Sequence, residues 1–379
     1  MTQFDDAAEV YRAIGVTPAI NASGTTTAYG GTKLRPEVMD IMNKAASVLV
    51  DVHELNRKVG KLIAEAIGAE AAFVCSGSAG GLVLQAAACI AGSDPARMSQ
   101  LPDTTGLKDE IIIQNSHRFA YDQAYRVAGA KLVSIGTGRS CHPWQLEAAY
   151  TDRTAAVAYL FSPFLTRKAI PLEDVCESAH ARGVPVIVDA ASMLPPRANL
   201  RKYLAMGADM VVYSGGKSIR GPQGTGILCG RADLIEAAVA NAAPGQFLGR
   251  GMKVAKEEVV GLLHALQIFL GEDEDAENER YLTMARTVVD ALIEFPGLDV
   301  AVRHDRHDYH IPIAVMTFTD EWNGPSRDQV TSGLADSDPR VYLHTLGNPD
   351  ELGVDPTNLS DEDLGVVLQS LREALLSRD

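Results

Sequence analysis

Short apolar runs rich in β-branched residues alternate with helical patterns through the middle of the chain, from about residue 70 to residue 240. The runs are continuously apolar rather than alternating, which indicates strands that are covered on both faces. The repeated order of strand, helix and strand predicts a mostly parallel seven-stranded sheet with helices on each side. The expected strands are 71–76, 110–114, 131–136, 155–161, 185–190, 209–214 and 225–230.

Two further regions flank this pattern. Helical patterns occur at 36–48 and 53–67, after the loop "NASGTTTAYGG". The elements expected beyond about residue 250 are helices at 254–271, 281–295 and 360–376 and strands near 298–303 and 311–318. We therefore predict an α/β fold with a helical segment (1–70) that packs on the large domain and a dimer partner, a large domain (71–250) and a small α+β domain (251–379).

The composition narrows the choice of partners. The 379 residues carry a formal net charge of −15 and the basic residues do not cluster into a stripe, so nucleic acid is not expected to bind. The sequence contains no apolar run of about 18 residues, so no membrane span is predicted. The acidic start "MTQFDDAAEVYRAIG" is unlike a secretion signal. The cysteines are scattered without a C-x-x-C pair, which favours free thiols in a reducing cytosol: Cys75, Cys89, Cys141, Cys176 and Cys229.

A single lysine, Lys217, lies in the glycine-rich stretch "VVYSGGKSIRGPQGTG" at 211–226. Two hypotheses compete for it: a phosphate clamp on a nucleotide, or a nucleophile that bonds covalently to a carbonyl cofactor. A phosphate loop requires glycines between a strand and a helix N-terminus, whereas these glycines lead into another strand. The nucleotide hypothesis is therefore the weaker one.

A better anion site is "CSGSAGG" at 75–81, where a strand passes through Ser76, Gly77 and Ser78 into a helix. Small residues allow the first backbone N–H groups of that helix to approach a phosphate, and the helix dipole assists. The alternative is that these residues only cap the helix.

Asp189 ends the apolar strand of "IVDAAS", at the edge where open parallel sheets bind ligands. It is expected to meet a cation, because a carboxylate buried alone is costly; a helix cap is the alternative. A phosphate cradle, this carboxylate and a lysine 28 residues later form the set that pyridoxal 5'-phosphate requires. In this hypothesis Lys217 forms a Schiff base, burial lowers its pKa, and Gly215 and Gly216 leave space for the ring.

Four blocks of the sequence together resemble one enzyme group. They are "INASGTTTAYGG", "FVCSGSAGG", "VIVDAAS" and "YSGGKSIRGPQGTGILCGR", and they cover most of residues 20–232. The pattern resembles fold-type I pyridoxal-phosphate (PLP) enzymes, and within them the group of selenocysteine synthase (L-seryl-tRNA(Sec) selenium transferase). The resemblance implies a PLP-transferase-like fold in which 71–250 binds the cofactor.

The resemblance also implies roles for single residues. Lys217 would be the Schiff-base lysine and Asp189 the partner of the ring nitrogen. His117 would stack on the ring, or it only caps the helix that follows. The residues expected at the phosphate are Ser76, Gly77, Ser78 and Ser214, and those expected to line the substrate pocket are Arg220 and Gln223.

Arg340, in the expected small domain, is a candidate for the substrate carboxylate. A guanidinium group binds a planar anion with two parallel hydrogen bonds, and small-domain arginines do this in many enzymes of the fold that the chain resembles. A surface ion pair is the alternative.

The sequence departs from the tRNA-dependent selenocysteine synthases, because neither their additional N-terminal segment nor a basic face is expected. The small relatives imply a PLP-dependent lyase on an amino acid or an amino sugar acid such as D-glucosaminate 6-phosphate. Lys217 would remove the α-proton, and β-elimination would release ammonia and a keto acid. Racemisation and aldol-type cleavage stay open, as does a cofactor-free α/β binding protein. We expect a cytosolic homodimer or larger homo-oligomer.

Two histidine-containing stretches complete the candidates. In "RHDRHDYH" at 303–310, the spacing of three between His304, His307 and His310 places them on alternating faces of a strand, so no metal site is predicted. His53 and Arg57 in "DVHELNRKVG" are interpreted mainly as the polar face of a helix, in a region that often faces a partner subunit in this fold.

Overall fold

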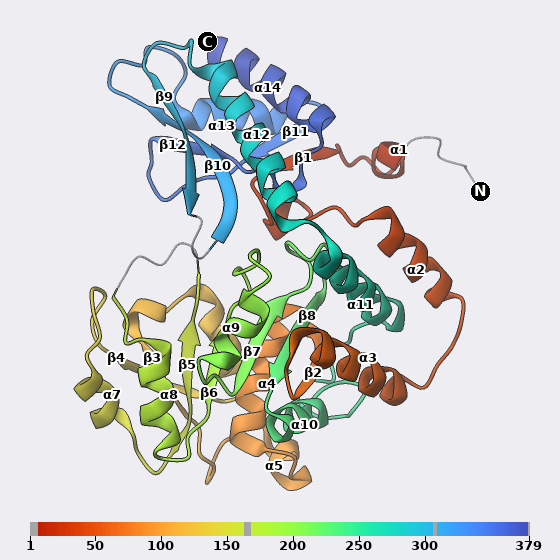
Figure 1. Ribbon diagram of the computed structural model, residues 1–379, viewed down its shortest axis with the longest axis vertical. Coiled ribbons are helices and arrows are strands. Elements are labelled where there is room, and N and C mark those ends of the chain that lie inside the picture. Colours follow the sequence, from red (N-terminus) through yellow and green to blue (C-terminus); the bar gives the residue numbers. More distant parts are fainter. Residues whose placement is uncertain (1–6, 163–167, 306–308, 378–379) are drawn as a thin grey trace. The chain divides into compact units, whose positions relative to one another are not determined.

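The computed structural model describes residues 7–162, 168–305 and 309–377 of the chain (Figure 1). It divides into two compact units, Leu34–Gly271 and the combination of Met1–Lys33 with Glu272–Asp379. These limits differ from the predicted boundaries near residues 70 and 250. The reason is a long-range pairing, in which strand β1 (Ala19–Ala22) runs parallel to β11 (Arg340–Leu343) and joins the start of the chain to its end.

The unit Leu34–Gly271, called the large unit below, is built on a seven-stranded sheet in the order β2-β8-β7-β6-β5-β3-β4. Strand β8 is antiparallel to both of its neighbours, and the remaining pairs are parallel. The mostly parallel fold-type I architecture is therefore confirmed. The strands are β2 (Ala71–Ser76), β3 (Glu110–Gln114), β4 (Lys131–Ile135), β5 (Thr154–Leu160), β6 (Val186–Asp189), β7 (Met210–Ser214) and β8 (Thr225–Gly230).

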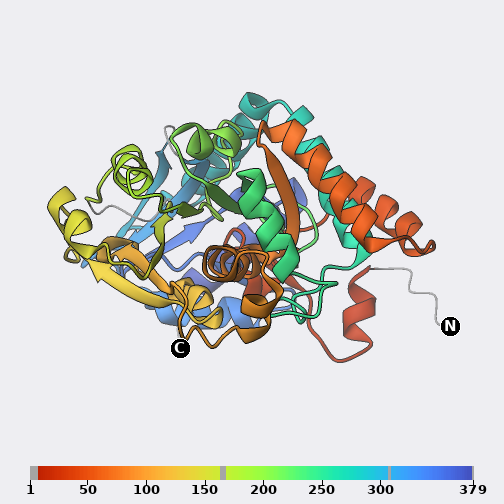
Figure 2. The same ribbon diagram turned by 90° about the horizontal axis from the view of Figure 1, so that it is seen from below.

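Helices cover both faces of this sheet, as the view in Figure 2 also shows. Within β3, Ile112 belongs to one hydrophobic core and Ile111 and Ile113 belong to the other. Burial on both faces explains why the strand sequences are continuously apolar. The helices described in this unit are α2 (Pro36–Ala46), α3 (Val52–Ile67), α4 (Gly77–Ala91), α5 (Pro95–Gln100), α6 (Gln123–Val127), α7 (Pro143–Ala149), α8 (Leu172–His180), α9 (Asn199–Ala205), α10 (Ala232–Asn241) and α11 (Lys256–Gly271).

The other unit, called the small unit, combines the β1–β11 pair with an antiparallel sheet in the order β12-β10-β9. The acidic stretch after residue 271 begins a helix, because Asp273 accepts hydrogen bonds from the N–H groups of Asp275 and Ala276 and so caps α12. The remaining elements are α1 (Ala7–Arg12), α12 (Glu274–Leu292), β9 (Leu298–Asp305), β10 (Tyr309–Phe318), α13 (Arg327–Asp336), β12 (Glu351–Val354) and α14 (Asp361–Leu376).

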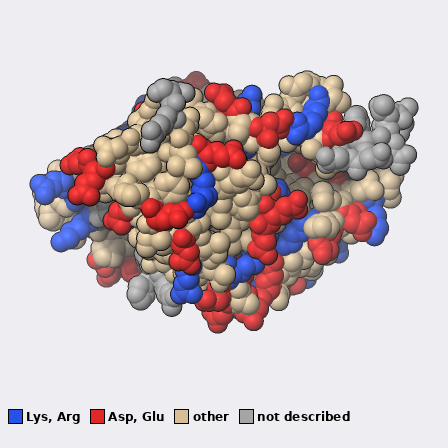
Figure 3. Space-filling model, turned by 90° about the horizontal axis from the view of Figure 1, so that it is seen from above, with Lys and Arg blue, Asp and Glu red and all other residues tan. Residues whose placement is uncertain are grey.

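Two surface properties bear on possible partners. Within the described ranges, no helix is long and apolar enough to cross a bilayer. Figure 3 shows Lys and Arg side chains scattered among Asp and Glu side chains, without a continuous basic stripe among the described residues of the face drawn. Together with the net charge of −15, this distribution gives no support to a nucleic-acid partner.

Candidate active site

The carboxyl ends of the parallel strands bring the predicted cofactor residues to one edge of the large sheet. The register aligns them: Asp189 of β6 pairs with Val212 of β7, and Ser214 at the end of β7 pairs with Gly226 of β8. Ser76 ends β2 and pairs with Thr225, the residue that precedes Gly226 at the start of β8. Because β8 runs antiparallel, the glycine-rich turn before it lies at this same edge.

Asp189 is a buried carboxylate with few partners. Its Oδ1 accepts a hydrogen bond from the Ala191 N–H at 3.0 Å, and it forms no ion pair among the described residues. Burial raises the pKa of Asp189, and the Ala191 N–H and the charge of Lys217 offset only part of this effect. A carboxylate in this state is stabilised by a nearby cation or proton donor.

Lys217 lies three residues beyond the end of β7 and is partly buried. Its Nζ donates a hydrogen bond to Ser192 Oγ at 2.5 Å. Burial lowers the pKa of Lys217, while the charge of Asp189 raises it in part. A lowered pKa increases the fraction of neutral amine, which is the nucleophilic form.

The two glycines before Lys217 pack against their own chain, so the expectation that they leave space for a ring is wrong. A side chain at Gly215 would overlap Thr225 and lie 2.6 Å from Leu262 Cδ1, and one at Gly216 would lie 2.6 Å from Gln223 Cα. The Gly215 N–H also donates to the Thr225 carbonyl at 2.9 Å. These glycines therefore allow the turn that carries Lys217 to fold back onto the start of β8.

The first turn of α4 presents backbone N–H groups at the same edge. Ser76 precedes this helix without a side-chain capping hydrogen bond, and Gly77 has a φ of +62° with open space where a side chain would lie. A side chain at Gly226 would lie 2.7 Å from Gly77 C and 2.9 Å from Ser78 N, so the glycine permits close packing of β8 on this turn. Unsatisfied N–H groups at a helix start bind anions.

His117 ends a short 3-10 turn directly after β3 and is buried. Its ring centroid lies 4.3 Å from that of Tyr159 in an edge-on arrangement, and its Nδ1 lies 3.5 Å from the Leu160 N–H. Burial lowers the pKa of His117 to about 4, so the imidazole is neutral at physiological pH. Stacking of His117 on a cofactor ring stays a prediction.

The residues predicted to contact substrate lie in different places. Arg220 and Gln223 belong to the turn that carries Lys217, where the Arg220 N–H donates to the Lys217 carbonyl at 2.8 Å and Gln223 is exposed. Arg220 has a φ of +55°, a left-handed conformation that is uncommon for residues other than glycine. Arg340 begins β11 of the small unit and is exposed. Their substrate roles stay predictions.

The aminotransferase class-V family matches residues 32–261, which is more than half of the chain and includes all of the large-unit site described above. The chain belongs to this family. Membership confirms that the protein has a PLP-dependent fold and that pyridoxal 5'-phosphate is the cofactor of its family.

Relatives extend the match over the rest of the chain. The 5'-C-glycyluridine monooxygenase-decarboxylase of a Streptomyces species is 33% identical over 97% of this chain and 92% of its own. The D-glucosaminate-6-phosphate ammonia lyase of Salmonella typhimurium is 30% identical over 96% and 97%, and a solved structure of D-glucosaminate-6-phosphate ammonia-lyase, 29% identical, covers 99% of both chains with a TM-score of 0.85. An L-seryl-tRNA(Sec) selenium transferase of Desulfovibrio desulfuricans is 25% identical over 94% and 81%, which confirms the predicted kinship.

The donor set of this class-V chain fits the family cofactor. A partly buried amine is present for the aldehyde at Lys217, and an under-paired buried carboxylate is present for a protonated ring nitrogen at Asp189. The uncapped first turn of α4 offers N–H groups to a phosphate. The buried Asp189 carboxylate and the N–H groups of the uncapped first turn of α4 are under-satisfied by the surrounding protein, which is the condition expected of a site built for a ligand.

Ser192, which the sequence analysis did not name, lies beside the candidate lysine of this class-V chain. It follows Asp189 by three residues in the block "VIVDAAS", and its hydroxyl accepts the hydrogen bond from Lys217. The turns that carry the two residues are tied together, because Ser218 Oγ donates to the Leu194 carbonyl at 2.7 Å. A hydroxyl residue just after a strand-end aspartate was the available signal. Only the fold revealed its partner.

Two other candidates take no part in this site. Tyr213, next to Ser214 in the chain, is fully buried and its hydroxyl donates to the Asn199 carbonyl at 2.7 Å, so it packs inside the large unit. Among the described residues no cluster of three or more His, Cys, Asp or Glu side chains could hold a metal. Of the histidine-rich stretch, His304 lies on β9, whereas His307 and the side chain of His310 lie outside the described residues.

Proposed function

We propose that this class-V enzyme is a PLP-dependent ammonia-lyase that converts an amino sugar acid into a keto acid and ammonia. The observation that carries the proposal is the partly buried Lys217 amine beside the buried, under-paired carboxylate of Asp189. The substrate class is supported by the ammonia lyase relative, which is 30% identical over nearly the whole of both chains and is named for D-glucosaminate 6-phosphate.

The residues of the carboxyl edge would divide the binding of the cofactor. The amine of Lys217 would hold the aldehyde, and Asp189 would pair with the protonated ring nitrogen. Phosphate would bind at the first turn of α4, with help from Ser214, while His117 would lie against the ring. When bound, the cofactor withdraws electrons from the substrate's α-carbon and makes the proton there acidic. The proposed phosphate residues are Ser76, Gly77, Ser78 and Ser214.

Lys217 is also the proposed proton carrier. As a free amine of lowered pKa, its Nζ takes the α-proton, and Ser192 Oγ keeps that nitrogen in place at 2.5 Å. The β-hydroxyl of the substrate then leaves as water, and hydrolysis of the unsaturated amine gives a keto acid and ammonia. This sequence consumes no oxidant. Arg220, Gln223 and Arg340 are the proposed contacts for the substrate's anionic groups.

A second candidate is oxidative decarboxylation of a glycyl-substituted nucleoside. The relative named as a monooxygenase-decarboxylase favours it, because its identity of 33% exceeds that of the ammonia lyase. The two reactions differ in every released product: the first yields ammonia and a keto acid, whereas the second consumes dioxygen and yields carbon dioxide. An assay that follows all four compounds separates them.

The decisive experiment treats the purified, PLP-loaded enzyme with D-glucosaminate 6-phosphate and with a series of D- and L-amino acids. We expect equal molar amounts of keto acid and ammonia from an amino sugar acid, without uptake of dioxygen. Borohydride should fix the cofactor to Lys217, and Lys217→Ala should remove the fixed cofactor and lower the rate at least 1,000-fold.

The outcomes that contradict the proposal are specific. Carbon dioxide release with dioxygen uptake would favour the second candidate, and inversion of an amino acid without ammonia would indicate a racemase. A colourless protein that takes up no pyridoxal phosphate would favour a binding protein instead. The control is Lys202→Ala, which changes a half-buried lysine of α9 in the same unit.

We also propose that the enzyme self-associates as a homodimer or larger homo-oligomer in the cytosol. Three consecutive apolar residues between α2 and α3 are exposed, with Leu49 at 90%, which is unusual for a surface without a partner. The five free cysteines agree with a reducing compartment. Light scattering tests the proposed self-association, and a mass equal to that of one chain at micromolar concentration would overturn that proposal.

A further inference from the structure

Helix α4 carries a polar side chain that is fully buried among apolar ones. Gln85 is 0% exposed, and the residues on either side of it belong to the hydrophobic core on that face of the large sheet. Its Nε2 donates a hydrogen bond to the Val188 carbonyl at 3.2 Å, whereas its Oε1 is buried without a hydrogen-bond partner among the described residues. A buried polar atom without a partner costs free energy. An apolar side chain would avoid that cost, so packing alone does not account for this amide.

The hydrogen bond of Gln85 reaches the strand that ends in Asp189. Val188 directly precedes Asp189 in β6, and successive side chains of a strand point to opposite faces of the sheet. Ile187 belongs to the core that contains the α4 side chains, and Val188 belongs to the core on the other face. Asp189 therefore points to the α4 side of the sheet, where Gln85 lies.

The side of α4 that carries Gln85 also carries part of its first turn. Ser78, Gly81 and Gln85 are separated by three and then four residues, so they lie on one side of the helix. A side chain at Gly81 would lie 2.5 Å from Val212 Cγ2, so this glycine permits close packing on β7. Val212 pairs with Asp189 in the sheet. This side of α4 therefore rests on β6 and β7 at the level of Asp189.

A ligand held at both places requires a fixed separation between them. In the proposed function the phosphate binds at the first turn of α4 and the ring nitrogen pairs with Asp189, so one small molecule joins a helix to a strand. Two anchors bind one ligand more tightly than either anchor alone only if their spacing matches the ligand. Ser78 and Gln85 are two helical turns apart, about 10 Å. A shift of the helix at Gln85 would therefore move the first turn as well.

We infer that Gln85 is a positioning residue of the cofactor site. Its hydrogen bond to the Val188 carbonyl fixes α4 against the end of β6 and so sets the distance between the first turn of α4 and Asp189. The inference rests on the cofactor contacts of the proposed function, and it does not depend on which reaction follows. It gives the buried amide a role in ligand binding as well as in folding.

Binding of the whole cofactor and of its parts to Gln85→Met tests the inference. The full chain is freed of cofactor with hydroxylamine, and each ligand is then titrated without substrate. Pyridoxal 5'-phosphate occupies both anchors, pyridoxal lacks the phosphate, and inorganic phosphate occupies only the first turn of α4. Schiff-base absorbance measures the first two ligands, and competition with pyridoxal 5'-phosphate measures the third. Methionine removes the amide but still fills the core.

We expect Gln85→Met to bind pyridoxal 5'-phosphate about tenfold more weakly than the parent chain does. Pyridoxal and inorganic phosphate should each bind within twofold of the parent, because each of them uses only one anchor. An unchanged affinity for pyridoxal 5'-phosphate would overturn the inference. An equal loss with all three ligands would also overturn it, because that pattern indicates general damage to the site.

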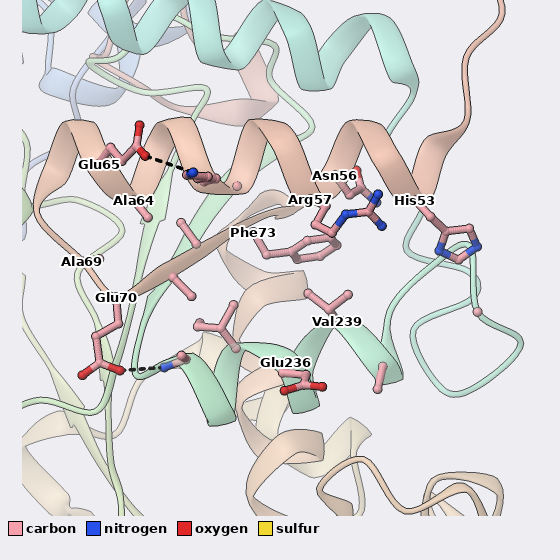
Figure 4. Close-up of a pocket in the computed structure, with 18 of the residues that line it drawn as sticks. His53, Asn56, Arg57, Ala64, Glu65, Ala69, Glu70, Phe73, Glu236 and Val239 are labelled. Atoms are coloured by element: carbon pink, nitrogen blue, oxygen red, sulfur yellow. Dashed lines mark hydrogen bonds and ion pairs between the residues drawn. The ribbon is translucent and has the colours of Figure 1, made fainter.

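Asn241→Leu is the matched control. Asn241 is likewise a fully buried amide, which donates to the Gly92 carbonyl at 2.9 Å and has an Oδ1 without a hydrogen-bond partner among the described residues. It ends α10, which lines the groove shown in Figure 4, and the lining of that groove includes none of the candidate-site residues. Asn241→Leu should leave the affinity for pyridoxal 5'-phosphate within twofold of the parent. An equal loss in Asn241→Leu and Gln85→Met would show an effect of any buried amide and would contradict the positioning role.

Gly81 gives a second test that does not depend on the folding of Gln85→Met. Gly81→Ala should push α4 away from Val212 and weaken the binding of pyridoxal 5'-phosphate about tenfold. Adding Val212→Ala makes room for the new methyl group and should recover at least threefold, although Cys75 Sγ still lies 3.0 Å from it. No loss in Gly81→Ala, or a loss that Val212→Ala does not reduce, would show that the spacing of α4 from the sheet does not control binding.

The positioning role and the proposed lyase reaction fail separately. Unchanged cofactor affinity in Gln85→Met, with normal release of ammonia and keto acid by the parent, would remove only the positioning role. A loss confined to the whole cofactor, in an enzyme that releases carbon dioxide instead, would remove only the lyase reaction.

Discussion

The large sheet has a buried aspartate near each end of its strands, and the two differ in how many hydrogen-bond donors surround the carboxylate. At the amino end, Asp209 accepts hydrogen bonds from the Val186 N–H at 2.7 Å, from His180 at 2.8 Å and from Arg231 at 2.9 Å. At the carboxyl end, Asp189 accepts one from the Ala191 N–H and its pKa is raised by burial.

The difference separates stability from function within one sheet. A fully paired carboxylate joins elements that pack together, and its removal leaves buried donors without partners. An under-paired buried carboxylate can still be stabilised by a positively charged or proton-donating group of a ligand. The under-paired carboxylate of Asp189 thus lies at the same end of the sheet as the first turn of α4 and the turn that carries Lys217.

The largest effect on stability is expected at the amino end. Asp209→Ala should lower the free energy of unfolding by about 3 kcal/mol, because the buried Val186 N–H loses its acceptor and the Arg231 guanidinium keeps only Asp233 as a partner. Urea denaturation followed by circular dichroism measures this loss. The turnover of the protein that stays folded should change less than twofold. A large drop in turnover would contradict the proposal that Asp209 serves stability and Asp189 serves function.

The opposite outcome is expected at the carboxyl end. Asp189→Asn should lower turnover about 100-fold, because the neutral amide no longer supports a protonated ring nitrogen. Stability should stay equal or rise: with a raised pKa, the folded state holds the proton more tightly than the unfolded chain, so ionisation at neutral pH opposes folding. A clear fall in the melting temperature of Asp189→Asn would contradict this reading.

His117, near the carboxyl end of the sheet, is expected to make the folding stability depend on pH. Its folded pKa of about 4 lies below the ordinary histidine value of 6.5, so the unfolded chain binds a proton first as the pH falls. The stability that this neutral histidine contributes is therefore complete above pH 6.5 and decreases toward pH 4. Between pH 6.5 and pH 5 the loss amounts to about 2 kcal/mol at most.

His117→Phe should flatten this acid limb, measured as the difference in unfolding free energy between pH 7 and pH 5. The matched control is His180→Phe at the amino end of the sheet, where the histidine contacts Asp209 instead. If both variants keep the full acid sensitivity of the parent chain, His117 does not cause it.

The smallest expected effect concerns the hydrogen bond between Lys217 and Ser192 in the candidate site. Ser192→Ala should move the pH midpoint for condensation of pyridoxal phosphate with Lys217 down by about one unit, because the ammonium form loses an acceptor at 2.5 Å. Borohydride trapping across a pH series measures the midpoint. Ser218→Ala is the control, since that hydroxyl donates to the Leu194 carbonyl and not to the lysine. An equal midpoint in Ser192→Ala and the parent would show that Ser192 does not hold the amine.

Local pattern was enough to place the elements of the large sheet and the residues at its edge. A buried strand requires a continuous apolar run, so β2, β3 and β8 begin and end at the residues that their sequences predict. The strand-end position of Asp189 and the separation of Lys217 from it follow from the same runs, which is why both could be named from the sequence.

Contacts between distant segments were decided by the tertiary structure. The pairing of β1 with β11 joins residues more than 300 positions apart and moves the start of the chain into the small unit, although neither segment's composition specifies the other. The glycines before Lys217 serve the turn's own packing, and the Ser192 hydroxyl meets the amine only because two turns lie at one sheet edge. Local periodicity determines which face of an element is apolar, whereas the partner of that face depends on how all the elements fill space together.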